Sequence, residues 1–127
     1  MLDHLRQQIA TTLAPTQYAA LATTGPAGLQ ADLLPCMARE LHIYLLLPST
    51  SDHLLNLEND PQVVLTTAEW QVHGQARVLG VAERQAAGAL LDAPAAPWGI
   101  VVDIQPTRLT IAHPGGWGAA ETIDLEQ

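Results

Sequence analysis

The sequence predicts a mainly β protein of the α+β type, a small antiparallel β-barrel of six to seven strands with peripheral helices. Two observations support this fold class. The chain has 127 residues, the usual size of one domain, so residues 1–127 are expected to form a single domain. Hydrophobic residues make up 48% of the chain and fall mostly into short runs of strand length. Because short antiparallel strands leave unpaired edges, closure into a barrel is the simplest arrangement.

The first part of the chain predicts a helix followed by three strands. Leucine and isoleucine recur every three or four residues from Leu2 to Leu13, so an amphipathic helix is expected over residues 1–14, ended by Pro15. The sequence "GPAG" is a turn signal. Pro35 cannot donate a ladder hydrogen bond, which indicates an edge strand or a bulge. The strands are predicted at residues 17–24, 29–36 and 41–48.

The stretch "PSTSDHLLNLENDP", residues 48–61, predicts a short helix. Ser51 or Asp52 is a suitable N-cap, because a short oxygen-bearing side chain there accepts from a free backbone N–H. The buried face of this helix is expected to consist of Leu54, Leu55 and Leu57.

The second half of the chain predicts more strands than helices. A buried strand is expected at residues 61–67, and a long one at residues 69–83, where apolar and polar residues alternate. Residues 84–93 favour a helix weakened by Gly88. Two strands are expected around Pro106, and residues 113–127 are expected to be a loop with a possible final strand.

Charge and composition restrict the partners. Thirteen acidic residues face five arginines and no lysine, for a formal net charge of −8. Such a surface repels phosphate backbones and anionic lipids, so neither nucleic acid nor a membrane is expected as a partner. The single cysteine, Cys36, excludes an internal disulfide framework, and the first residues resemble neither a signal peptide nor a membrane span. We therefore expect a cytoplasmic protein.

The hydroxyl residues Ser49-Thr50-Ser51 have two interpretations. They can cap the helix that follows, or they can form half of an anion-binding loop. The two interpretations overlap, because a capped helix start is also where anions bind.

The order of motifs from "IYLLLPSTSDHLLNLENDPQVVLTT" to "WQVHGQARV" resembles the FMN-binding split-barrel family, typified by pyridoxamine 5′-phosphate oxidase. The earlier "ALATTGPAGLQADLLP" is similar to the family's first hairpin, and "IVVDIQPTRLTI" to its late strand pair. The resemblance implies a split barrel, a homodimer with FMN held between its subunits, a small-molecule substrate and oxidoreductase activity. Related split barrels use a deazaflavin, which is a further possibility.

The resemblance also implies which residues contact the cofactor. The hydroxyl loop would bind the phosphate, Gln71 would contact the edge of the isoalloxazine, and Trp98 would cover the ring. Packing in the core or in a dimer interface is the alternative for Trp98. No catalytic or metal-binding residue is predicted. The expected cofactor contacts are Ser49, Thr50, Ser51, His53, Gln71 and Trp98.

One departure from the family pattern concerns the phosphate. The hydroxyl residue matching Ser51 is followed in the oxidase pattern by Arg and Lys, but here by Asp52 and His53. A phosphate dianion needs several donors and compensating positive charge. The affinity for phosphate should therefore be weaker, unless Arg77 or Arg108 reaches the site.

A second branch, the haem-utilisation split-barrel proteins, is locally similar. His53, Asn56-Leu57 and Asp60-Pro61 match the spacing of its His, Asn-Leu and Asp-Pro. This implies haem as an alternative ligand, with His113 as a candidate contact. Loss of the cofactor, leaving a non-catalytic dimeric barrel, is the third hypothesis.

Overall fold

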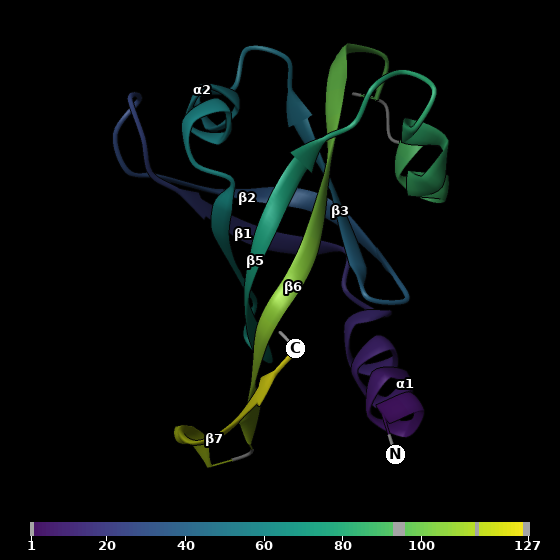
Figure 1. Ribbon diagram of the computed structural model, residues 1–127, viewed down its shortest axis with the longest axis vertical. Coiled ribbons are helices and arrows are strands. Elements are labelled where there is room, and N and C mark those ends of the chain that lie inside the picture. Colours follow the sequence, from purple (N-terminus) through teal and green to yellow (C-terminus); the bar gives the residue numbers. More distant parts are fainter. Residues whose placement is uncertain (1, 93–95, 114, 126–127) are drawn as a thin grey trace.

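The computed structural model describes residues 2–92, 96–113 and 115–125. In this part of the chain the strands form one antiparallel sheet in the order β3-β2-β1-β4-β5-β6-β7. Pairing of β3 with β6 closes the first six strands into a barrel, which confirms the predicted mainly β fold (Figure 1). The strands are β1 (Tyr18–Thr23), β2 (Gln30–Arg39), β3 (His42–Pro48), β4 (Gln62–Thr66), β5 (Trp70–Val78), β6 (Gly99–His113) and β7 (Gly116–Asp124).

The barrel interior is filled by the inward-facing half of each strand. Along β5, Trp70 and Val72 are fully buried, whereas His73 and Gln75, which follow them on the opposite face, are exposed, as the alternation predicts. The Trp70 indole Nε1 donates to Thr16 Oγ1 at 3.1 Å, so the polar end of this large side chain is satisfied. Each fully buried leucine of the barrel contributes on the order of 2 kcal/mol.

The helix α1 (Leu2–Leu13) lies at the opposite end of the barrel from α2 (Asp52–Asn59), as Figure 1 shows. Ile9 and Leu13, four residues apart on α1, are fully buried against the core. Among the described residues, no helix has the length and apolar character needed to cross a membrane.

The strand β2 is not at an edge of the sheet, so that part of the Pro35 prediction is wrong. Pro35 pairs with Tyr18 of β1, and the pairing of β2 with β3 begins only at Cys36. The Cys36 N–H points to β1, where it donates to Gln17 O. Because successive N–H positions alternate in direction, the missing N–H of Pro35 would have faced β3. The proline therefore sits where β2 and β3 separate.

The strand β6 is continuous across Pro106, whereas the sequence predicted two strands. The register with β5 shifts between His73 and Gly74, where Gly74 faces Pro106 and His73 faces Arg108. Thr107 is the extra residue of this bulge, and its Oγ1 donates to His73 O at 3.1 Å. A bulge allows a strand to continue past a residue that cannot join the ladder.

Three shorter segments differ from prediction in detail. Arg84–Asp92 forms 3₁₀ turns broken at Gly88, whose φ of 54° is left-handed, instead of one α-helix. The helix α2 buries Leu57, as predicted, together with His53 and Asn56, and Leu54 is partly buried against the core. Leu55 is 45% exposed, so its place on the buried face was predicted wrongly. The strand β7 begins at Gly116, within the stretch expected to be loop.

Candidate functional site

A cleft of about 330 Å³ opens where β2 and β3 separate. Leu34 and Pro35 of β2 form one side, and Leu46 and Leu47 of β3 form the other. Pro35 has no backbone N–H to donate to β3, and the two strands are paired only from Cys36 onward. The proline therefore accounts for the opening in this part of the barrel wall. The remaining lining residues are Pro48, Ser49, Thr50, Trp98 and Gly99.

The upper rim of the cleft joins the end of β3 to the start of β6. Pro48 pairs with Gly99, and the Ser49 N–H donates to Trp98 O at 3.3 Å. A Cβ on Gly99 would lie 2.4 Å from the Leu46 side chain, so glycine allows the two strands to approach here. The Trp98 side chain is 74% exposed beside this rim. A mostly apolar cleft with two hydroxyls and a projecting indole suits a flat heteroaromatic ligand.

The start of α2 lies just beyond this rim. Ser51 is its N-cap, with extended backbone, and its Oγ accepts from His53 N at 3.2 Å. Asp52 occupies the first turn and is exposed, where its carboxylate is favourable for the helix dipole. The capping interpretation of Ser51 is therefore confirmed.

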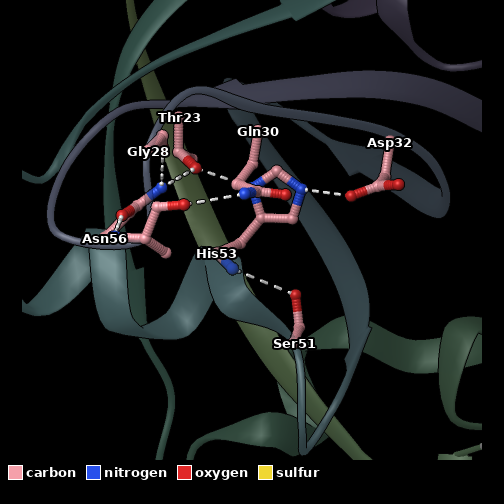
Figure 2. Close-up of polar contacts among 8 residues, drawn as sticks. Thr23, Gly28, Gln30, Asp32, Ser51, His53 and Asn56 are labelled. Carbon is pink, nitrogen blue, oxygen red and sulfur yellow. Dashed lines mark hydrogen bonds and ion pairs between the residues drawn. The ribbon is translucent and has the colours of Figure 1, made fainter.

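The His53 ring points into the protein, toward β1 and β2, as Figure 2 shows. Its Nε2 lies 2.8 Å from Asp32 Oδ2, and its Nδ1 lies 2.7 Å from Thr23 Oγ1. Because an ionised carboxylate can only accept, Nε2 carries the proton in the neutral ring, and Nδ1 accepts from the Thr23 hydroxyl. His53 is only 1% exposed, so both ring nitrogens are engaged inside the protein.

Asn56, one turn further along α2, holds the β1–β2 hairpin (Figure 2). Its Nδ2 donates to Thr23 Oγ1 at 3.0 Å and to Gly28 O at 2.9 Å, and its Oδ1 accepts from Ala27 N at 2.9 Å. It is fully buried, and every hydrogen-bonding group of its amide is used. His53 and Asn56 therefore clamp the β1–β2 hairpin to α2.

Sequence reasoning did not find this clamp. His53 and Asn56 are three residues apart, and Leu57 is four from His53, so all three share one helix face. That spacing was the available signal, but the three leucines of the helix suggested a different buried face. Thr23, Ala27 and Gly28 lie in a hairpin about 30 residues earlier, and no local pattern reveals that they supply partners.

Two other candidates lie away from the cleft. Gln71 is half-buried on the outer face of β5, where its Nε2 is 3.3 Å from His73 Nε2. His113 ends β6, with its Nε2 3.9 Å from Glu121 on β7. Neither residue lines the cleft. Within the residues that the structure describes, no group of three or more metal-ligating side chains comes together.

Cys36 has the properties of a core residue. It is 6% exposed, and burial raises the pKa of its thiol to about 11. Because the thiolate is the nucleophilic form, this cysteine is a poor nucleophile at neutral pH.

No protein-family model and no curated protein sequence matches this chain. Several solved structures, by contrast, match its fold. A protein of the pyridoxinephosphate oxidase family from Clostridium acetobutylicum, related to general stress protein 26, superposes with a TM-score of 0.69 at 10% identity, covering 95% of this chain and 93% of the other. The chain has the split-barrel fold. This confirms the fold that the sequence resemblance implied.

Two further split barrels differ in what their names say they bind. An FAD-binding protein from Mesorhizobium loti matches with a TM-score of 0.66 at 14% identity, covering 81% of this chain and 88% of the other. A haem-binding protein from Mycobacterium smegmatis matches with a TM-score of 0.70 at 23% identity. That match covers 94% of this split barrel but only 57% of the haem-binding chain.

Of the residues predicted to contact a cofactor, the split barrel brings three to the cleft and leaves the others outside its lining. Ser49, Thr50 and Trp98 line it together. Ser51 caps α2, and His53 is buried behind it. Of the three hydroxyl residues, Ser49 and Thr50 therefore line the cleft, whereas Ser51 stabilises the helix.

Proposed function

We propose that this split barrel is a cytoplasmic, dimeric flavin-binding protein that serves as an oxidoreductase. The observation that carries the proposal is the cleft between β2 and β3, where Ser49, Thr50 and an exposed Trp98 surround an apolar floor. Its volume of about 330 Å³ lies in the range of about 300–1,000 Å³ that small-molecule sites have. The single buried cysteine suits a reducing compartment.

The ring portion of a flavin fits the character of these residues. A planar tricyclic ring gains from contact with the Trp98 face and the leucine side chains, and its polar edge can exchange hydrogen bonds with Ser49 and Thr50. The flavin would supply the redox chemistry, and the chain's part would be to bind and orient the ring. No catalytic acid or base is assigned.

Haem has less support from the geometry. Iron needs an imidazole nitrogen that is free to coordinate it, and His53, the residue that suggested haem, has both ring nitrogens hydrogen-bonded and is 1% exposed. His113 does not line the cleft. We therefore propose flavin ahead of haem.

The dimer is supported by exposed apolar side chains on the outer face of the barrel. Directly opposed residues of antiparallel strands share a face, and the register places Leu33, Ala20, Thr66 and Gln71 in one row across β2, β1, β4 and β5. Leu33 is 69% exposed, and Tyr18, which lies on the same face of β1 as Ala20, is 58% exposed, so two large apolar side chains are available to a partner. A second copy on this face would put Gln71 in the interface.

We expect the purified protein to have twice the chain mass of 13.6 kDa in solution, and Leu33→Lys to convert it to a monomer. Placing a charge in an apolar interface removes buried area and adds a desolvation cost. Light scattering after gel filtration measures the mass. Val81→Lys, at a loop residue that is 84% exposed, is the matched control and should stay dimeric. A monomeric wild-type protein would contradict the dimer.

We expect the purified protein, freed of any ligand, to bind a flavin with a Kd in the micromolar range, seen as quenching of flavin fluorescence. Burial of the ring against an indole accounts for both the affinity and the quenching. A parallel titration with haemin, followed by Soret absorbance, tests the alternative. The absence of binding by riboflavin and FMN at about 50 μM, near a ΔG of −6 kcal/mol, would refute the proposed function.

A further inference from the structure

Among the residues that the structure describes, no charged side chain lines the cleft. Its lining consists of leucine, proline, glycine, tryptophan and two hydroxyl residues. This bears on the flavin that it would hold, because FMN carries a phosphate dianion whereas riboflavin carries none. Burying or docking a dianion without a cation is strongly unfavourable.

The backbone donors at the start of α2 are largely taken. The N–H groups of Ser49, Ser51 and Leu54 donate to Trp98 O, Pro48 O and Ser51 O, respectively. The His53 N–H donates to Ser51 Oγ, which uses the cap hydroxyl as the acceptor. A helix start binds anions through free N–H groups, and of the six backbone N–H groups from Ser49 to Leu54 only those of Thr50 and Asp52 are left without a partner among the described residues.

The two side chains that follow the cap do not replace these donors. Asp52 is exposed at the first position of α2, and its negative charge repels an anion there. The His53 ring faces away from the cleft, between Thr23 and Asp32 (Figure 2). Its Nε2 already donates to the Asp32 carboxylate at 2.8 Å, so the ring has no donor to offer in the cleft.

Three arginines lie outside the cleft: the two sequence candidates, Arg77 and Arg108, and also Arg84. Arg77 bonds Glu83 at 2.5 Å and lies 3.8 Å from Asp103, and the hydrogen bond to Glu83 raises the pKa of Arg77. Arg84 donates to Ala96 O at 2.8 Å. Arg108 is exposed on β6, opposite His73 of β5 in the strand register. None of these three lines the cleft.

We propose that the cleft recognises the uncharged ring of its ligand and makes no use of a phosphate, so that riboflavin or another neutral planar heteroaromatic is bound at least as tightly as FMN. This inference rests on the proposed flavin-binding function and specifies the ligand class for the same site. It departs from the FMN predicted from the family resemblance, because the ring fits the residues present and the phosphate does not.

The test compares the affinities of riboflavin and FMN by fluorescence quenching at about 20 mM and 500 mM salt. We expect the Kd of FMN to equal or exceed that of riboflavin. The difference should be greatest at low salt, because screening removes the repulsion by Asp52. Replacing Asp52 with a cation, Asp52→Arg, should lower the Kd of FMN about tenfold and leave that of riboflavin within about twofold.

Glu58→Arg is the matched control. Glu58 is exposed in the last turn of the same helix, and its replacement changes the net charge by the same amount. It should change the affinity for FMN much less than Asp52→Arg does at the same salt concentration, since its charge lies about 9 Å further along the helix. Circular dichroism checks that both variants are folded.

Two results would overturn the inference, and they can be told apart. Binding of FMN more than about twofold more tightly than riboflavin at low salt would mean that a cation or free N–H groups reach the phosphate, and flavin binding itself would stand. Binding of neither flavin would overturn both this inference and the proposed function.

Discussion

Replacing Asn56 with leucine should lower the free energy of unfolding by about 3 kcal/mol, because it leaves the Ala27 N–H and the Gly28 carbonyl without their partner. Leucine fills a similar volume, so the loss reports hydrogen bonding more than a cavity. Urea denaturation followed by tryptophan fluorescence measures the change. We also expect the amides of the β1–β2 hairpin to exchange faster, because Asn56 supplies three of the hydrogen bonds that tie that hairpin to α2.

Asn59→Leu controls for the substitution itself. Asn59 is exposed on the same helix, and its side chain donates only to Leu55 O. Its replacement should change the unfolding free energy by less than about 0.5 kcal/mol. Equal losses for the two variants would refute the clamp.

Replacing Gly74 with alanine should cost about 3 kcal/mol, because the barrel wall has no room for a side-chain atom at this point. A Cβ there would lie 2.7 Å from Gln105 O and 2.9 Å from the Ile104 side chain. The first contact is to backbone, which cannot move without disturbing the bulge that carries β6 past Pro106. Thermal unfolding should show a drop in Tm of about 10 °C for a chain of this size.

Gly118→Ala in β7 is the control for Gly74→Ala. A Cβ at Gly118 meets nothing within 4 Å, and its backbone is not left-handed. Its Tm should stay within about 2 °C of the wild type. An unchanged Tm for Gly74→Ala would contradict the close approach of β5 and β6.

The sequence was sufficient to predict strands in which buried and exposed residues alternate. Trp70 and Val72 face inward and His73 faces outward, as expected of a strand with one buried face. The prolines were harder to interpret. A proline marks an interruption of a ladder, but only the register shows whether the strand ends, bulges as at Pro106, or separates from one neighbour as at Pro35.

Long-range partners explain what the sequence missed at the site. His53 could be assigned to solvent or to a cofactor from its own neighbourhood, because its actual partners, Thr23 and Asp32, lie on two other elements. By contrast, Ser49 and Thr50 were placed beside Trp98 in the cleft by the closing pair Pro48 and Gly99. The resemblance to split barrels suggested the location of the site, and the hydrogen bonds show that Ser51 and His53 are already engaged within the protein.

The most direct test of the cleft as the ligand site is the flavin titration repeated on Trp98→Ala and Trp117→Ala. Both tryptophans are exposed, but only Trp98 lines the cleft. We predict that Trp98→Ala weakens riboflavin binding at least tenfold, which corresponds to about 1.4 kcal/mol, and that Trp117→Ala leaves it unchanged. Unaltered riboflavin binding by Trp98→Ala would contradict the account.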